Sequence, residues 1–231
     1  MNERASPPDA RPAAAESDSA DEASPPAGMV LVPAGPFLFS RRKVEVPLGA
    51  FWIDLHPVTN GDYEAFVAEF RLQPPLHWPP GGLTNAERDL PLVRVTYAEA
   101  ERYATLTGKA LPTPAQFEKA ARGTDGRKYP WGDEVRGRAA NTREAGIGRL
   151  TPVDAFPQGA SPYGCLDMAG NVLHWTRGVY DEARGTRVVM GSSFRRFLGA
   201  CSWYYEEDPE VRHDDLGFRC VWTPPKDESP A

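Results

Sequence analysis

The first part of the chain alternates short apolar runs with one stretch of helical spacing. Residues 29–35 and 43–54 are typical of short strands interrupted by proline and glycine. From Tyr63 onward, apolar residues recur at i, i+3, i+4 and i+7, the pattern of an amphipathic helix, with Thr59 or Asn60 placed to cap it. The pattern therefore predicts short strands followed by a helix.

Two further helices are predicted from their start and stop signals. Thr96 opens one with a capping-box glutamate three residues later, and Gly108 ends it. Thr113 opens the next, with Pro114 at the first helical position and a glutamine three residues after the threonine, and Gly123 ends it.

The pattern changes after Gly123, where about 65 residues carry turn residues throughout and no helical period. The later strand-like runs are residues 187–191 and 217–222. Long irregular segments in a compact domain are usually functional, or are held by ions and side-chain hydrogen bonds. The chain is therefore expected to be an α+β protein with a loop-rich second half.

Composition separates the ends from the body. Residues 1–28 are mostly Ala, Pro, Ser, Asp and Glu and carry six acids against two bases, out of a formal net charge of −6 for the whole chain. Such a segment buries too little apolar surface to fold, so we expect disorder there and in residues 224–231, around one domain of residues 29–223. The nearly balanced body, without a Lys/Arg run, argues against nucleic acid or an anionic membrane as the main partner.

Compartment signals are few. The beginning of the chain has no apolar segment like that of a secretory signal, and no apolar stretch approaches a membrane span. Three cysteines, Cys165, Cys201 and Cys220, make an odd number without the spacing of a zinc site or a disulfide framework. We therefore expect a cytoplasmic protein.

Five motifs occur in a fixed order: "FWIDLHPVTNGDYEAF", "KALPTPAQFEKAARG", "YPWGDE" with "AANTREAGIG", "YGCLDMAGNVLHWT", and "RVVMGSSF" leading to "LGFRC". Together they resemble the formylglycine-generating enzyme, or sulfatase-modifying factor, family over residues 29–222. The resemblance implies a single α+β domain with a C-type-lectin-like core. It also implies kinship with bacterial proteins in which such a domain is joined to a kinase or protease.

The resemblance implies a copper site only in part. The founding enzymes oxidise a substrate cysteine with O₂ at Cu(I) held by two thiolates after a Gly-Gly-Ser segment, and Ser193 matches that serine. The downstream thiolate falls on Cys201 and the upstream one on Arg196, which is cationic and only a hydrogen-bond donor. One thiolate holds Cu(I) poorly, so we expect no copper. Cys201 is then either a small core residue or a redox-active or metal-bound thiol.

The resemblance also implies structural calcium, which takes hard oxygen ligands. One site would use the Asn171 side chain and the Val172 carbonyl, although His174 stands where a glutamate is expected. The other would use Asn141, the Thr142 carbonyl and Glu144. The alternative for this second site is a turn capped by asparagine.

Further pocket residues follow from the same resemblance. His174 is interpreted either as a catalytic base, beside Cys201 and Ser193, or as a hydrogen-bonded histidine of the interior. Between the motifs "GSSF" and "LGFR", residues 194–215 are expected to run mainly as loop across a pocket mouth, with at least partial exposure of their large side chains. The binding residues predicted for this pocket are Trp175, Arg195, Arg196, Trp203, Tyr204 and Asp215.

Two functions remain open at this point. The first is a non-catalytic binding or scaffold module on a lectin-like fold, a pseudoenzyme with an unknown protein or small-molecule partner. The second is an oxidoreductase of the same family with altered, metal-dependent oxidative chemistry at Cys201. The sequence leaves open the oligomeric state and whether catalysis is retained.

Overall fold

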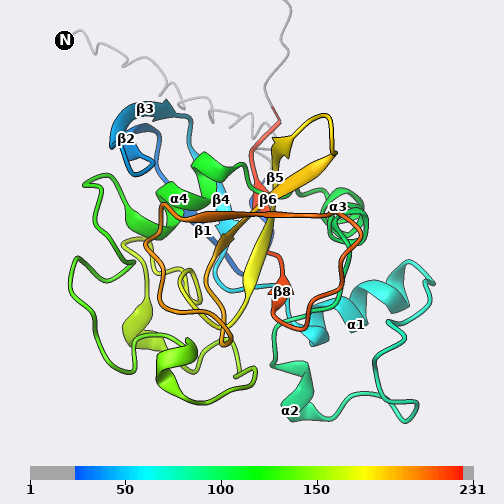
Figure 1. The fold of residues 1–231 in the computed structure, drawn as a ribbon. Helices are drawn as coiled ribbons and strands as arrows, with labels where there is room; N and C mark the ends of the chain where they lie inside the picture. Colours follow the sequence, from blue (N-terminus) through cyan, green and yellow to red (C-terminus); the bar gives the residue numbers. More distant parts are fainter. Residues whose placement is uncertain (1–23, 226–231) are drawn as a thin grey trace, which may run out of the picture.

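The protein is described by a computed structural model that covers residues 24–225. Most of the predicted tails, 1–28 and 224–231, lies outside this range. The described residues form three sheets and four α-helices, whose arrangement is shown in Figure 1. None of the helices in residues 24–225 has the length and apolar character that crossing a membrane requires.

The strands form three separate sheets within the described residues. A three-stranded antiparallel sheet has the order β1 (Met29–Val32), β4 (Phe51–Asp54), β9 (Val221–Trp222), which joins the two ends of the domain. A hairpin pairs β2 (Gly35–Phe39) with β3 (Val44–Leu48). A four-stranded sheet has the order β7 (Tyr204–Glu207), β6 (Thr186–Gly191), β5 (Leu173–Asp181), β8 (Leu216–Gly217), in which β5 and β8 are parallel.

The three predicted helices are confirmed. They are α1 (Asn60–Glu69), α3 (Tyr97–Leu106) and α4 (Pro114–Arg122), and each is preceded by a threonine N-cap whose capping box is closed. The box of α1 uses Asp62 as its third helical residue. A fourth helix, α2 (Asn85–Arg88), was not predicted. It has the same threonine-based box but buries no side chain. Two 3₁₀ turns, Arg143–Ala145 and Pro157–Gly159, interrupt the irregular half.

Two strands correct the sequence-based picture. The segment after Gly123 was expected to have no regular element before residue 187, yet β5 spans Leu173–Asp181 and is the longest strand in the described chain. Residues 194–215 were expected to be mainly loop, and this is true except at β7 (Tyr204–Glu207), which pairs with β6. The four-stranded sheet therefore reaches further into the second half than the pattern indicated.

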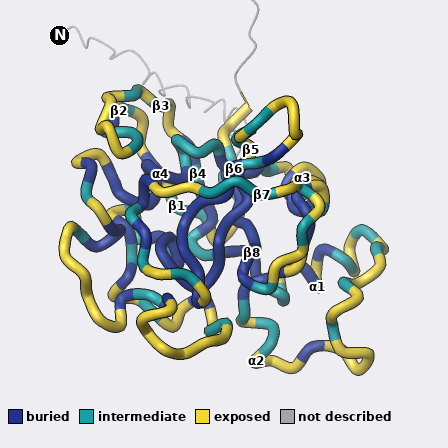
Figure 2. The backbone as a smooth tube through the Cα atoms, viewed as in Figure 1, coloured by how far each residue is buried: buried dark blue, intermediate teal, exposed yellow. Residues whose placement is uncertain are grey.

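The core has two large clusters, one on each side of β5 and β6 (Figure 2). One packs α1 and α3 against β5, with Trp175 fully buried and its indole N–H donating to the Val95 carbonyl at 3.0 Å. The other packs α4 against β4 and β6 and contains Cys165 and Cys201. Residues of β6 belong to both clusters, and His174 of β5 lies against Phe117 of the second, so the strands that hold the predicted site are packed on both faces.

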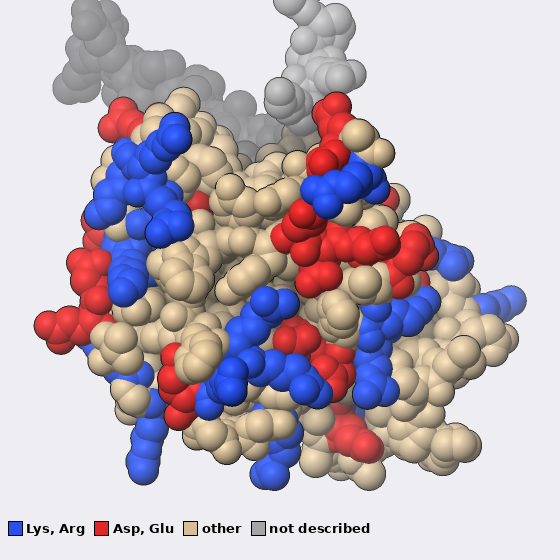
Figure 3. All heavy atoms as spheres, viewed as in Figure 1, with Lys and Arg blue, Asp and Glu red and all other residues tan. Residues whose placement is uncertain are grey.

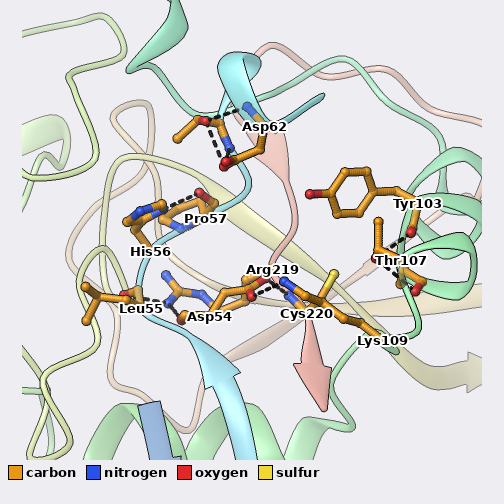
Figure 4. Close-up of polar contacts among 12 residues, drawn as sticks. Asp54, Leu55, His56, Pro57, Asp62, Tyr103, Thr107, Lys109, Arg219 and Cys220 are labelled. Carbon is orange, nitrogen blue, oxygen red and sulfur yellow. Dashed lines mark hydrogen bonds and ion pairs between the residues drawn. The ribbon is translucent and has the colours of Figure 1, made fainter. Parts of the chain in front are cut away.

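A buried polar cluster fixes the two ends of the domain to each other (Figure 4). The Asp54 carboxylate of β4 pairs with Lys109 Nζ at 2.8 Å and accepts the Cys220 backbone N–H at 2.7 Å. Arg219, fully buried, donates to the carbonyls of Asp54 at 3.0 Å and Leu166 at 2.6 Å. The guanidinium thus satisfies backbone carbonyls, a structural role that links β9 to the irregular half.

Candidate functional site

Cys201 lies in the interior, not in an open pocket. Its residue is 1% exposed, and its backbone N–H donates to the Lys128 carbonyl at 2.9 Å. Burial raises the pKa of its thiol to about 12, although the nearby Arg122 guanidinium acts in the opposite direction. A neutral, enclosed thiol is a poor nucleophile and a poor metal ligand, because both roles require the thiolate. The structure therefore agrees with the interpretation of Cys201 as a small core residue.

Arg196, at the position of the second thiolate, is turned toward β7. Its guanidinium carbon lies 4.4 Å from the centre of the Tyr205 ring, and its Nη2 lies 3.7 Å from the Glu207 carboxylate. The cation is thus held by an aromatic face and an acid. These residues do not fit Cu(I), which needs a pair of soft thiolates.

Ser193, a candidate catalytic residue, and Asp215, a candidate pocket residue, are in contact in the structure. The Ser193 hydroxyl donates to Asp215 Oδ2 at 2.6 Å, and both residues are buried. The Asp215 backbone carbonyl also accepts a hydrogen bond from the Leu173 N–H at 2.8 Å. Through this bond the pair connects the start of β5 to the segment before β8. The serine hydroxyl is thus occupied by a carboxylate in a site closed to solvent. Trp175, another predicted pocket residue, belongs to the first core cluster instead.

His174 is fully buried on β5, against Phe117 at a ring distance of 5.1 Å. Neither ring nitrogen has a hydrogen-bond partner in the described residues. Burial, followed by the positive charge of Arg219, lowers the pKa of the imidazole well below its usual range. The ring is therefore neutral and enclosed, and it differs in one respect from the hydrogen-bonded interior histidine that the sequence suggested. It has no contact with solvent through which a catalytic base would reach a substrate.

The predicted calcium residues form a hydrogen-bonded network around two asparagines. Asn171 Oδ1 accepts from Asn141 Nδ2 at 3.1 Å and from the Thr151 N–H at 3.1 Å. The Val172 N–H bonds to the Gly170 carbonyl at 2.8 Å. The carboxylate of Glu144 is directed elsewhere, to the Leu198 N–H at 3.0 Å.

One buried oxygen of this network, Asn141 Oδ1, has no partner among the described residues. Calcium takes six to eight oxygens, and Asn141 Oδ1 could supply one, whereas Asn171 Oδ1 already accepts hydrogen bonds. The Thr142 carbonyl, another predicted ligand, accepts the Ala145 N–H at 3.0 Å. Calcium binding stays a prediction, and a calcium titration of the thermal midpoint would test it.

The exposed part of the predicted site is aromatic. Trp203 and Tyr204 are 39% and 56% exposed, as expected, and the Tyr204 ring lies 6.2 Å from that of Tyr180 on β5. With Val179 they form a surface that we call the aromatic surface, defined by Val179, Tyr180, Trp203 and Tyr204. Two hollows of about 390 and 380 Å³ open on it, and both are lined by Ser202 and Tyr204.

Charges of opposite sign flank the aromatic surface. Arg41, Arg42 and Lys43 occupy the turn between β2 and β3, and Arg41 lines one of the hollows. Glu206 and Glu207 follow on β7. Figure 3 shows uncharged surface between a basic group of side chains and an acidic stretch over β7. The arrangement suits a partner with an apolar anchor and charged flanks.

Arg195 lies at a different opening. It is exposed, as predicted, and its Nε donates to the Asp214 carboxylate at 2.8 Å. It lines a cleft with His77 and Trp78, which is separate from the two hollows of the aromatic surface. The predicted binding residues therefore divide among the core, the aromatic surface and this cleft.

The family follows from a match over most of the chain. The model of the sulfatase-modifying factor enzyme 1-like domain matches residues 14–224. The chain belongs to this family. The fold class predicted from the sequence, one α+β domain with a C-type-lectin-like core, is confirmed with it.

Two named proteins and one solved structure are similar to this chain. The mouse protein "Inactive C-alpha-formylglycine-generating enzyme 2" is 29% identical over 262 residues, which cover 84% of this chain and 85% of the mouse protein. "Hercynine oxygenase" of Mycolicibacterium smegmatis is 30% identical over 190 residues, covering 64% of this chain but 44% of that enzyme. Among solved structures, CarF superposes with a TM-score of 0.72 at 21% identity, over 87% of this chain and 99% of CarF, a likeness of fold.

Several residues of the exposed sites were missed by the sequence reasoning. Val179 and Tyr180 lie in the overlooked β5, and their alternation with buried residues is broken by register shifts in the β5–β6 pair. Arg94 and Arg149 gave no signal, because they are single charges in segments without a motif. His77 and Trp78, in the segment "LHWPPGG", line the same cleft as these two arginines.

Proposed function

We propose that this chain is a non-catalytic binding module that captures a protein partner through the aromatic surface. The observation that carries the proposal is the loss of the thiolate pair: an arginine held by Tyr205 and Glu207 replaces one cysteine, and the other is buried and neutral. An intact fold without that pair retains the scaffold and its exposed surfaces, and surfaces of this kind change function readily on a fixed core.

The chemistry of the aromatic surface supports a protein or peptide as the partner. Tyr and Trp supply large contact areas at low entropy cost and are enriched at interface hot spots. Tyr204 and Trp203 extend outward from a sheet whose β5 and β6 strands are packed on both faces, so the surface is preformed. The mouse relative is named as an inactive enzyme, which is consistent with a non-catalytic role for this chain.

The alternative is altered oxidative chemistry at Cys201, which the similarity to hercynine oxygenase keeps in view. In residues 24–225, no group of three or more His, Cys, Asp or Glu side chains lies close enough to hold a metal ion. The neutral thiol of Cys201 and the enclosed ring of His174 give this alternative less support than the binding role.

The first experiment tests whether the chain has formylglycine-generating activity. The protein is incubated with Cu(I), O₂ and a peptide containing Cys-x-Pro-x-Arg, and the peptide mass is followed. We expect no conversion of thiol to aldehyde, because Arg196 cannot bind the metal. Stoichiometric aldehyde formation would overturn the non-catalytic proposal.

The second experiment locates the partner. A photo-cross-linking p-benzoylphenylalanine is incorporated at position 204 and, as a matched control, at Phe197, an exposed aromatic outside the aromatic surface. We expect one protein of the producing cell to cross-link from position 204 and not from position 197, and to be lost when Trp203 is replaced by alanine. Equal cross-linking from both positions, or none from position 204, would contradict capture at this surface.

A further inference from the structure

A second opening in the described chain is chemically different from the aromatic surface. It is a cleft of about 430 Å³ between the loop that carries His77 and Trp78, the segment around Arg94, the turn at Arg149, and Phe194 with Arg195. This volume is in the range of small-ligand pockets. Three of its side chains are arginines.

The acids of the cleft are already engaged. The Asp214 carboxylate is paired with Arg195 through Nε at 2.8 Å and through Nη2. Glu87 Oε2 accepts from the Thr84 N–H and hydroxyl, both at 2.8 Å, in the capping box of α2. Both oxygens of Asp214 and the Oε2 atom of Glu87 are therefore occupied, and Glu87 keeps its negative charge.

Arg94 and Arg149 are left with their charges uncompensated by contact. Both are exposed, and neither guanidinium forms an ion pair or hydrogen bond with a side chain in residues 24–225. Counting Glu87, Asp214 and the three arginines, the cleft carries one net positive charge. A guanidinium fork binds carboxylate and phosphate oxygens in two parallel hydrogen bonds, so two free forks facing one cleft favour an oxyanion.

The interior of the cleft adds an apolar contact surface. Leu83 and Val93 are buried residues of the lining, and Phe194 closes one side. The indole Nε1 of Trp78 is buried and has no acceptor among the described residues. This N–H is enclosed, so a ligand in the cleft would lie beside the indole without reaching its donor.

The electrostatics of His77 agree with this reading of the cleft. Its pKa is lowered first by partial burial and then by the positive charges of Arg94 and Arg212, while Glu99 acts in the opposite direction. The positive charges of the two arginines thus add to the effect of burial, and a bound anion would act against that contribution to the pKa.

We propose that this cleft binds a small organic oxyanion with an apolar body, its carboxylate or phosphate held by Arg94 and Arg149 and its apolar body lying against the lining around Phe194. The proposal does not rest on the aromatic surface and stands or falls independently of the binding-module function.

The test uses four probes on the full chain: 3-phenylpropionate, phenyl phosphate, the neutral 3-phenylpropanol and inorganic sulfate. Binding is followed by NMR through the indole N–H signal of Trp78, assigned with Trp78→Phe, and through the titration of His77. We expect the two organic anions to shift the Trp78 signal saturably and to raise the pKa of His77. The tighter of the two identifies carboxylate or phosphate as the preferred head group, and sulfate shows what the charge contributes without the apolar body.

Three variants assign the binding. Arg94→Gln and Arg149→Gln should each weaken the organic anions about tenfold, since removing one charge-assisted contact corresponds to roughly 1.4 kcal/mol. Arg71→Gln is the matched control, because Arg71 is exposed, lies outside the cleft, and shares the left-handed backbone of Arg94, with φ of 51° against 59°. It should bind as the unmodified chain does.

Three outcomes would overturn the proposal. They are the absence of a saturable shift up to about 10 mM of either anion, equal affinity for 3-phenylpropanol, and equal weakening in Arg71→Gln. If Arg94→Gln lowers the thermal midpoint, the proposal is tested with Arg149→Gln alone. This second change leaves the Arg149 backbone carbonyl, which accepts a hydrogen bond from Asn141 Nδ2, in place.

Discussion

At the scale of single residues, the interior holds ionisable groups whose protonation is set by burial. Asp167, beside the asparagine network, accepts from Asn171 Nδ2 at 2.8 Å. Burial raises the pKa of its carboxyl from 3.8 to about 7, against the opposing effects of that hydrogen bond and of the Arg219 charge. The folded state therefore favours the neutral carboxyl, so the free energy of unfolding depends on pH through this residue.

Replacing Asp167 with Asn should stabilise the protein at pH 8. A carboxyl whose pKa is raised in the folded state contributes stability that is complete below about pH 3.8. This contribution is lost as the pH rises to about 7, because the carboxyl ionises at lower pH in the unfolded chain than in the folded protein. Asp167→Asn cannot ionise, keeps an acceptor for Asn171, and suits the φ of 54° at this position.

Denaturant unfolding at several pH values checks this. We expect the variant to exceed the unmodified chain by on the order of 2–4 kcal/mol at pH 8, with the difference shrinking toward pH 4. Glu182→Gln, an exposed acid without a hydrogen bond in the described residues, should show no such trend. A constant difference at all pH values would mean that Asp167 does not titrate as described.

The three thiols should resist alkylation in the native protein. All three cysteines are buried, and burial raises the pKa of each thiol, to about 12 for Cys201. Because iodoacetamide reacts with the thiolate, we expect no modification at pH 8 until urea unfolds the chain, when all three react. Rapid and selective labelling of Cys201 in the native state, detected by peptide mass spectrometry, would point to a reactive thiol.

At the scale of elements, the sequence correctly predicted the helix starts, which depend on a few neighbouring residues. The threonine caps placed α1, α3 and α4 because a cap is decided by a few neighbouring residues. The same signal at Thr84 was present but overlooked, since α2 has no apolar face. The strand β5 was missed because its first four residues, Leu173 to Thr176, are all buried, so that no alternation marks it.

The candidate site was less predictable than the elements. The family motifs gave Ser193 and Asp215 as separate site residues, and only the structure shows that they are hydrogen-bonded at 2.6 Å. The same motifs gave Trp175 and His174 as pocket residues, yet both face the core, because the side of a strand that is covered depends on packing from distant elements. Arg94 and Arg149 come together only through the tertiary fold.

The N-cap of α4 should contribute more to the free energy of unfolding than the N-cap of α2. The Thr113 N–H and Oγ1 form a closed box with Gln116, at 2.9 and 3.1 Å, on a helix that buries Phe117 and two alanines. Thr113→Ala should lower the free energy of unfolding by about 1 kcal/mol. The matched change Thr84→Ala, on a helix with no buried residue, should cost less in global unfolding, because α2 can fray locally. Equal losses in denaturant melts would contradict this difference.

At the scale of the whole molecule, the fold of the family is combined with a site that lacks one of the two thiolates. A lectin-like core closed by β1, β4 and β9 holds the β5–β6 pair between two apolar clusters. On this frame, the inward residues maintain packing while the outward ones form an aromatic surface and an arginine-lined cleft. Changes in the two openings are therefore expected to alter binding without altering the fold.

Alanine variants distinguish outward from inward aromatics on the same sheet. Trp203 and Tyr204 are substantially exposed, so the double variant Trp203→Ala with Tyr204→Ala should lower the free energy of unfolding by no more than about 1 kcal/mol. Trp175→Ala is the control. It removes a fully buried indole and its hydrogen bond to Val95, and should cost roughly 3–5 kcal/mol. Denaturant melts measure all three proteins, and a loss in the double variant comparable to that of Trp175→Ala would place Trp203 and Tyr204 in the core. That result would remove the surface on which partner capture depends, because aromatics that hold the fold together are not free to meet a second protein.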